Sequence, residues 1–338
     1  MQNESKRKRE NSSATIYDIA KLAGVNPSTV SRALNNPGRI NSVTEARTRA
    51  AAKELNYRVN PFARALPTGR TKMLAMVVAD ITNPMFFEAV RGAETLAMDS
   101  GYTLVIVESQ ESGSLEATAV ERLLPTVDGL ILVTTRLEDE EVERISNLKP
   151  VVLMNRQIPG IPDVVPQVNS GISEAIAHLK SLGHNSIAYV SGPSNSWMSR
   201  HRWDLIMKQA VAEGMKVVEI GPNEPTLEGG KASADYVVAS GVTGVIAYND
   251  LMAIGLMSQL AAKGKEIPKD LSIIGFDDIF GSDLTTPALT TIKSPLYRAG
   301  ELAMQLVLSE LEDSQNSKQE VASLTTQLVK RASTAKAR

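Results

Sequence analysis

From Met73 to Asp277 the sequence alternates regularly between short apolar runs and helical stretches, a pattern that few folds can accommodate. The first run, MLAMVVA (73–79), is entirely apolar, as expected for a parallel strand buried on both faces. Similar runs follow at 102–109, 129–135, 151–155, 186–192, 216–220, 244–248 and 271–277. Helices are expected between them at about 86–99, 114–124, 138–146, 171–182, 199–213, 229–239 and 250–263. The alternation predicts a doubly wound α/β architecture with parallel sheets, in two Rossmann-like lobes.

Composition restricts the class of protein. The chain has 338 residues, of which 43% are apolar, which suffices for two or three domains with real cores. No window approaches the roughly 20 uncharged apolar residues of a membrane span, and the polar start MQNESKRKRENSS lacks the apolar segment of a secretory signal. The absence of cysteine excludes disulfides and thiolate metal sites and fits a reducing cytoplasm, where we expect the protein to act.

Charge is distributed unevenly along the chain. Residues 1–72 carry 14 Lys and Arg against five Asp and Glu, a net charge of +9, whereas residues 73–338 carry 22 against 33, a net charge of −11. A basic head on an acidic body predicts that the head meets a polyanion. The first 14 residues, which contain the run KRKR, are expected to be a disordered tail that adds loose phosphate attraction at most.

The segment from Thr15 to residue 59 reads as a small helical domain. Thr15 is expected to cap a helix, with Asp18 as its capping-box partner, and Gly24 to end that helix. Asn26 and Pro27 suit the cap and first position of a second helix. A third helix is expected from Ser42, capped reciprocally with Glu45, to about Leu55. Two short helices joined by a tight turn are typical of a helix–turn–helix.

The second helix is polar where it would meet a partner. Ser28, Ser31, Arg32 and Asn35 are left facing outward once its apolar residues point inward. Short polar side chains and arginine reach base edges in the DNA major groove. The alternative is an ordinary three-helix bundle with a polar surface. The tight turn, the polar helix start and the positive charge favour DNA binding.

These residues carry a resemblance to a known family. Asp18-Ile19-Ala20, Gly24-Val25 and Thr29-Val30-Ser31-Arg32 are similar to the DNA-binding head of the LacI/GalR family of bacterial transcription regulators. In that family the two residues that open the recognition helix vary and choose the operator, and here they are Pro27 and Ser28. These two offer few direct base contacts, which gives Arg32 more weight. The resemblance implies a DNA-binding set in the head of Thr15, Tyr17, Pro27, Ser28, Thr29, Ser31, Arg32 and Asn35.

The segment 60–72 is expected to be a hinge helix and linker. Asn60 can cap a helix that Pro67 stops after less than two turns, far below the roughly 12–15 residues of a stable isolated helix. The stretch resembles the family's hinge helix, whose paired copies enter the minor groove. By that resemblance Asn60, Ala63, Arg64 and Leu66 contact DNA, and Leu66 wedges between base steps. The alternative is a plain interdomain linker.

The ends of the strands predict a ligand site. In open α/β sheets a ligand binds beyond the carboxyl ends of the strands, and polar groups of both signs cluster there. Such a mixture suits a small hydroxyl-rich ligand. The body resembles the family's periplasmic-binding-protein-like core, and the combined reading predicts an effector site formed by Asn83, Phe86, Ser109, Thr134, Asn155, Arg156, Arg202, Asn249, Asp250 and Asp277.

Several of these positions have open alternatives. Asn83 has the alternative role of shaping a turn, and Asp250 of capping the helix that follows it. Asn155 stands where many sugar binders carry Asp, and Ser294 where the family often has Gln, so the sugar identity stays open. A neutral monosaccharide or polyol, of the ribose, nucleoside or inositol type, is expected ahead of hexose phosphates.

No catalytic, cofactor or metal motif emerges. The three histidines lack metal-ligand spacing, and no P-loop, G-x-S-x-G elbow or G-x-G-x-x-G after a strand occurs. We therefore expect no enzyme and no cofactor, but a homodimeric, effector-controlled repressor that binds a palindromic operator. The effector-binding core is expected at 73–332, with lobe 1 at about 73–166 and 294–320 and lobe 2 at about 167–293 and 321–332. A periplasmic sugar-binding protein and a sugar-converting enzyme are the alternatives.

Overall fold

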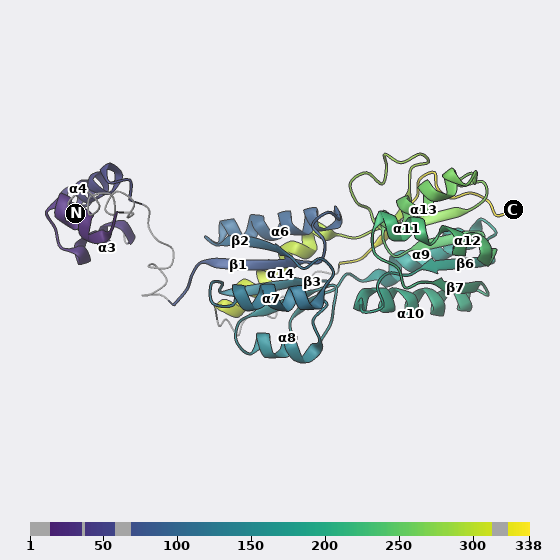
Figure 1. The fold of residues 1–338 in the computed structure, drawn as a ribbon, viewed down its shortest axis with the longest axis horizontal. Coiled ribbons are helices and arrows are strands. Elements are labelled where there is room, and N and C mark those ends of the chain that lie inside the picture. Colours follow the sequence, from purple (N-terminus) through teal and green to yellow (C-terminus); the bar gives the residue numbers. More distant parts are fainter. Residues whose placement is uncertain (1–13, 36–37, 58–68, 313–323) are drawn as a thin grey trace, which may run out of the picture. The chain divides into compact units, whose positions relative to one another are not determined.

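The computed structural model describes residues 14–35, 38–57, 69–312 and 324–338. It divides into two compact units, residues 1–71 and 72–338, which are described separately (Figure 1). The expected basic tail up to residue 13 and the hinge residues Asn60, Ala63, Arg64 and Leu66 lie outside the described residues.

The first unit is a three-helix head of α2 (Ile16–Ala23), α3 (Pro27–Asn35) and α4 (Ser42–Glu54). Thr15 and Asp18 form the predicted capping box: the Thr15 N–H donates to the Asp18 carboxylate (2.8 Å) and the Asp18 N–H to the Thr15 hydroxyl (3.4 Å). Gly24 ends α2 with φ +62°, a left-handed conformation that glycine adopts without steric cost. The three helices enclose a small core centred on the fully buried Ile19 and Val30.

The predicted cap of the third helix is wrong. Asn41, not Ser42, caps α4, because its side-chain oxygen accepts from the Val43 N–H (2.9 Å). Glu45 is engaged elsewhere: its carboxylate accepts from the Gly38 N–H (3.1 Å) and pairs with Arg49.

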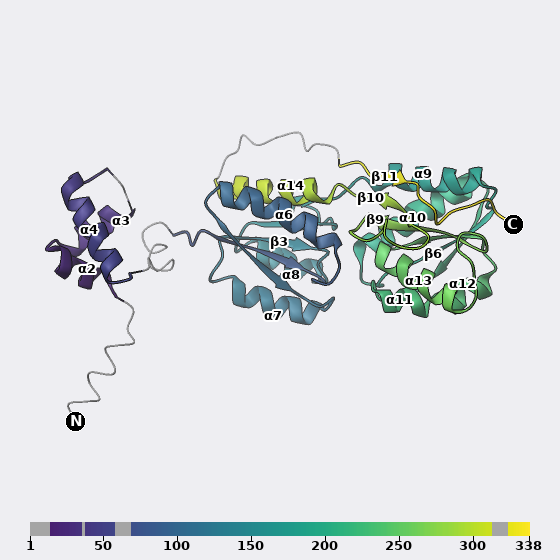
Figure 2. The ribbon, with the colours of Figure 1, turned by 90° about the horizontal axis from the view of Figure 1, so that it is seen from above.

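Lobe 1 of the second unit is built on a five-stranded parallel sheet in the order β2-β1-β3-β4-β5. Its strands are β1 (Met73–Val78), β2 (Thr103–Glu108), β3 (Gly129–Val133), β4 (Val151–Met154) and β5 (Asp163–Val164). The helices α6 (Met85–Asp99) and α14 (Leu296–Leu311) cover one face, and α7 (Gly113–Leu123) and α8 (Asp139–Ser146) the other (Figure 2).

Lobe 2 is built on a six-stranded sheet in the order β11-β10-β9-β8-β6-β7, in which only β11 is antiparallel to its neighbour. Its strands are β6 (Ser186–Val190), β7 (Lys216–Ile220), β8 (Gly244–Ala247), β9 (Ser272–Asp277), β10 (Thr290–Lys293) and β11 (Gln327–Val329). The helices α9 (Val168–Ser181) and α10 (Trp197–Ala212) lie on one side, and α11 (Leu227–Ala232), α12 (Ala234–Ser240) and α13 (Asp250–Ala262) on the other (Figure 2).

The apolar runs became strands because both faces of each are covered. Along β1, Leu74 and Met76 pack towards α6 and α14, whereas Ala75 and Val77 pack towards α7 and α8, and all four are buried. A continuous apolar run is the pattern that a strand between two helical layers requires.

One predicted helix is two. The stretch 229–239 divides into α11 and α12 at Ser233, whose hydroxyl donates to the Gly230 carbonyl (2.8 Å). Gly229 and Gly230 hold α11 against neighbouring backbone, since a Cβ on either would lie 2.1 Å from the carbonyl oxygen of Glu224 or Met252. This close approach fixes α11 against the neighbouring backbone.

Within the described residues, the chain crosses between the lobes three times: after β5, between β10 and α14, and from Leu324 to β11. Two of these crossings are joined, because the Gln167 N–H donates to the Leu324 carbonyl (2.8 Å) and the Thr326 N–H to the Gln167 carbonyl (3.3 Å). Each lobe is therefore completed by a distant part of the chain. Within the described residues, no helix is both long and apolar enough to cross a membrane.

Candidate ligand cleft and nucleic-acid interface

Unusual backbone conformations gather at one edge of the two core sheets. The described residues include eight non-glycine residues with positive φ, and six of them stand at the carboxyl ends of strands: Gln110, Glu111, Thr134, Asn155, Asp277 and Asp278. Thr134, at φ +54°, is β-branched, for which this conformation is a genuine outlier. Backbone strain of this kind clusters at functional sites.

A narrow cleft lies among these strand ends, between the two lobes. We call it the inner cleft; its free space is about 20 Å³, on the order of one water molecule. It is lined by Asn83, Met85, Phe86, Glu111, Thr134, Arg136 and Asn155 of lobe 1 and by Met198, Arg202, Pro225, Tyr248, Asn249 and Asp277 of lobe 2. An outer cavity of about 730 Å³ adjoins it, shares Glu111 and Pro225, and is also lined by both lobes.

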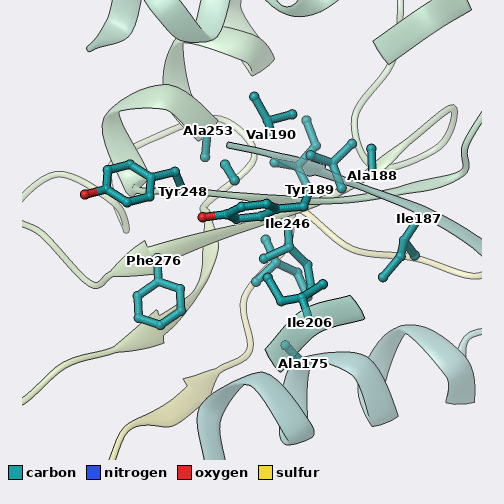
Figure 3. Packing of buried hydrophobic residues seen from close by; sticks show 14 of the residues in the cluster. Ala175, Ile187, Ala188, Tyr189, Val190, Ile206, Ile246, Tyr248, Ala253 and Phe276 are labelled. Atoms are coloured by element: carbon teal, nitrogen blue, oxygen red, sulfur yellow. The ribbon is translucent and has the colours of Figure 1, made fainter. Parts of the chain in front are cut away.

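Arg202 is the central group on the lobe-2 side. Its guanidinium stands 3.5 Å from the ring centroid of Phe276 and 5.1 Å from that of Tyr248, and its Nη2 lies 3.1 Å from Oδ1 of Asp277. It also donates to the Tyr248 carbonyl. Tyr248 and Phe276 lie at one end of the lobe-2 core and Ile187 at the other (Figure 3). The two rings at this end of the core thus contact the Arg202 guanidinium.

Asp277 is the acidic partner of Arg202. Its side chain is 3% exposed, and burial raises the pKa of the carboxyl, an effect that the neighbouring Arg202 guanidinium opposes. The Ser294 hydroxyl adds a long contact of 3.5 Å to Oδ1. A buried carboxylate fixed by one guanidinium is a strong acceptor for a ligand hydroxyl.

Two buried polar atoms in the wall of the inner cleft lack a partner among the described residues. They are the hydroxyl oxygen of Thr134 and Nε of Arg202, one from each lobe. A buried polar atom without a hydrogen bond costs free energy, and a ligand hydroxyl placed between the lobes would remove that cost.

Seven of the ten sequence-predicted effector residues line the inner cleft: Asn83, Phe86, Thr134, Asn155, Arg202, Asn249 and Asp277. Two of them also shape the backbone. Asn83 accepts from the Met85 N–H (3.0 Å), and Asn249 caps α13 by accepting from the Met252 N–H (2.9 Å).

The structure does not bring the other three, Ser109, Arg156 and Asp250, into the lining of the inner cleft. Arg156 turns towards the loop after β3, donating to the Leu137 carbonyl (2.5 Å) and to Asp139 (2.5 Å). Asp250 is fully buried, and three donors of lobe 2 surround its carboxylate.

The prediction omitted Glu111, Arg136 and Tyr248 from the site. Arg136 stands two residues beyond Thr134, so its position after the end of β3 could have predicted it. Glu111 follows β2 by three residues, and only the left-handed turn at Gln110 and Glu111 carries it back into the cleft.

The head presents its predicted DNA-binding residues to different degrees. Tyr17 is 69% exposed, and Ser28 and Arg32 are exposed, whereas Pro27, Thr29 and Ser31 are half-buried. Thr15 uses its hydroxyl in the cap of α2, donating to Asp18 (2.7 Å). Asn35 lies at the last position of α3.

Fold and cleft together define a two-lobed binding protein that carries a helix–turn–helix head. Residues 15–60 match the model of the bacterial regulatory proteins of the lacI family, and residues 176–334 match a periplasmic binding protein-like domain. The chain belongs to the LacI family of bacterial regulatory proteins, which are transcription regulators and not enzymes.

Named relatives and solved structures agree with this assignment. The chain is 31% identical to the HTH-type transcriptional repressor CytR of Escherichia coli (strain K12) over 91% of this chain and 92% of the relative. It is 34% identical to the ribose operon repressor of Bacillus subtilis (strain 168), over 87% and 91%. The Lac repressor dimer bound to operator and the anti-inducer ONPF superposes with a TM-score of 0.84 at 25% identity, over 96% of this chain and all of that one.

A ligand-bound structure also matches. A LacI family transcriptional regulator from Enterococcus faecium with bound ribose has a TM-score of 0.68 at 28% identity, over 79% of this chain and all of that one. Among the residues that the structure describes, no three His, Asp or Glu side chains are grouped so as to hold a metal ion.

Proposed function

We propose that this protein is a homodimeric, cytoplasmic transcription repressor whose affinity for a palindromic operator is controlled by a neutral sugar or polyol bound in the inner cleft. The chain's membership of the LacI family, whose members include named repressors, supports the regulatory role. The ribose-bound relative and the ribose operon repressors support a pentose-like effector.

The head supports the DNA-binding part of the proposal. The exposed Ser28 and Arg32 of α3 are free of the head's core and suit contact with a major groove. Residues 60–72 would supply the hinge, with Leu66 as the minor-groove wedge. Two heads in a symmetric dimer would read two half-sites about one helical turn apart.

One observation carries the effector part: the unpartnered Thr134 hydroxyl and Arg202 Nε line the same cleft from opposite lobes. The inner cleft holds about one water molecule as it stands, so the lobes would have to move apart to admit a sugar. A neutral polyol has donors and acceptors on both of its sides, so one molecule would then pair both atoms. Ligand binding would thereby favour one arrangement of the lobes, and the hinge helices would fold or melt in response.

Exposed apolar side chains support the dimer. Ile81 and Phe87 of lobe 1 are 51% exposed, and Phe280 and Leu284 of lobe 2 are 81% and 70% exposed. Ile279, next to Phe280, and Phe86, next to Phe87, belong to the same buried cluster. Large apolar side chains of this kind are typical of a surface that a second subunit covers.

The proposal is tested by a gel shift on palindromic duplexes selected from a random library, with and without ribose, nucleosides and inositols. Operator binding that one of these compounds changes at least tenfold is the expected result. Arg32→Ala should weaken operator binding about 10- to 100-fold and leave effector binding unchanged. Arg202→Met should weaken effector binding and leave operator binding in the absence of effector unchanged. Binding that no polyol alters, while a purine base or a sugar phosphate does, would refute the effector class.

A further inference from the structure

The lobe-1 wall of the inner cleft contains an ion pair, Arg136 with Glu111, whose members are not among the sequence-predicted effector residues. Nη2 of Arg136 lies 2.6 Å from Oε2 of Glu111, and Nε donates to the same oxygen at 2.9 Å. The Arg136 side chain is 2% exposed and that of Glu111 25%. This pair is therefore part of the cleft wall and not a mobile surface contact.

The surrounding backbone holds the pair in place. Glu111 follows Gln110 in a turn where both residues are left-handed, at φ +57° and +52°. The loop closes tightly at Gly113, where a Cβ would lie 2.8 Å from the Arg136 carbonyl oxygen. The Arg136 N–H donates to the buried Glu116 carboxylate (2.8 Å). Both partners are thus positioned before any ligand arrives.

Arg136 also holds Thr134, which lines the same wall of the cleft. Its Nη1 donates to the Thr134 carbonyl (2.7 Å), which braces Thr134 in its left-handed conformation. The Thr134 hydroxyl is the buried atom without a partner in this wall. Arg136 is therefore a positioning residue for Thr134, in addition to lining the cleft itself.

The charges of the inner cleft balance. Its described lining contains four charged side chains, which form two pairs: Arg136 with Glu111 in lobe 1, and Arg202 with Asp277 in lobe 2. A phosphate or carboxylate placed between them would meet a carboxylate beside each guanidinium, and like charges in a poorly hydrated site repel strongly. A hydroxyl, which both donates and accepts, suits either member of each pair.

We propose that Glu111 is a specificity-determining residue that excludes anionic effectors by neutralising Arg136, so that the inner cleft selects neutral polyols over their phosphate esters. The inference rests on the proposed effector function of this cleft. Without the Glu111 charge, the Arg136 guanidinium loses the carboxylate with which it forms an ion pair, and the same cleft gains affinity for phosphorylated sugars.

The test measures binding to the full-length protein by calorimetry, using three matched probe pairs: ribose and ribose 5-phosphate, adenosine and its 5′-monophosphate, and inositol and inositol monophosphate. For the pair whose neutral member binds, the wild type should prefer that member at least tenfold. Glu111→Gln should raise the affinity for the phosphate ester, relative to that for the neutral compound, at least tenfold.

Two further variants separate charge from shape. The double variant Glu111→Gln with Arg136→Gln should lose the gained phosphate affinity, because it removes the uncovered cation. Glu140→Gln, the same change at an exposed position of lobe 1, should match the wild type. If Glu111→Gln does not fold, as judged by its thermal denaturation, Glu111→Ser replaces it.

Different results would overturn the role of Glu111 and the proposed effector function. A wild type that binds a neutral compound, with a folded Glu111 variant that still excludes its phosphate ester, overturns the inference and leaves the proposed function intact. Persistence of the gained affinity in the double variant also overturns it. A wild type that binds none of the neutral compounds contradicts the proposed effector class itself.

Discussion

Replacing Asp250 by alanine should destabilise the core strongly. Its buried carboxylate accepts from the Ile279 N–H (2.9 Å), the Ser282 hydroxyl (2.6 Å) and the Thr291 hydroxyl (2.6 Å), which join the start of α13 to the loop after β9 and to β10. The two hydroxyls can turn to other acceptors, but the backbone N–H cannot. An orphaned buried N–H costs about 1–3 kcal/mol and each lost charge-assisted bond about 1.5–3 kcal/mol, so we expect a loss of about 3–5 kcal/mol.

Asparagine at the same position should cost less. Oδ1 of Asp250 lies 2.0 Å from where a Cβ on Gly275 would stand, so the side chain is confined against that backbone. An amide oxygen in the place of Oδ2 keeps the bonds from Ile279 and Ser282, and the NH₂ group then meets Thr291, whose hydroxyl must reverse its role. We expect a loss of about 1–2 kcal/mol.

Urea unfolding near pH 7.5, followed by the fluorescence of Trp197 and Trp203 in lobe 2, measures both variants. Effector titration of Asp250→Asn provides the second measurement, and its affinity should stay within about threefold of the wild type, since Asp250 does not line the inner cleft. The reasoning is refuted if Asp250→Ala unfolds at the urea concentration of the wild type. Loss of effector binding in a fully stable Asp250→Asn would instead make this residue the effector contact that its position after a strand predicts.

Two further outcomes are expected. Burial raises the pKa of Asp250 from 3.8 to about 7, so the folded state holds this proton more tightly than the unfolded state, and the resulting stability is present below pH 4 and lost as the pH rises towards 7. The difference in the free energy of unfolding between wild type and Asp250→Asn should therefore fall by at least about 1 kcal/mol between pH 5 and 7, and a constant difference would contradict this. Gly92→Ala should destabilise the core by about 2–4 kcal/mol in urea titrations, because the new Cβ would lie 2.0 Å from the Tyr297 carbonyl oxygen where α6 meets α14, which outweighs a gain of about 1 kcal/mol in helix propensity. An unchanged midpoint for Gly92→Ala would mean that the two helices separate at little cost.

The strands were predictable because burial on both faces leaves a direct mark in the sequence. Leu74, Ala75, Met76 and Val77 are all apolar although they face opposite helical layers. The head was predictable for a different reason: capping is local, so Thr15 and Asp18 could be paired from their spacing alone. The sequence does not decide which of two adjacent residues is the N-cap when both can cap a helix, as with Asn41 and Ser42 before α4.

The cleft was predictable only in part. Strand ends locate residues such as Arg202 and Asp277 at the right edge of a sheet, but they do not tell which way a side chain turns. Asp250 follows a strand as Asn249 does, yet the first turn of α13 directs it into the interior of lobe 2. The position of Glu111 in the cleft depends on a left-handed backbone conformation, which glutamate does not favour. No feature of the sequence therefore indicated that Glu111 lines the cleft.

The repeated crossing between lobes has a consequence for synthesis of the chain. The helix α6 covers only part of one apolar face of the lobe-1 sheet, and α14 covers the rest. The ribosome translates α14 only after lobe 2 up to β10. When the nascent chain has emerged from the ribosome as far as Lys293, lobe 2 is nearly complete and lobe 1 still lacks α14. Lobe 2 is therefore expected to fold earlier than the part of the core that precedes it in the sequence.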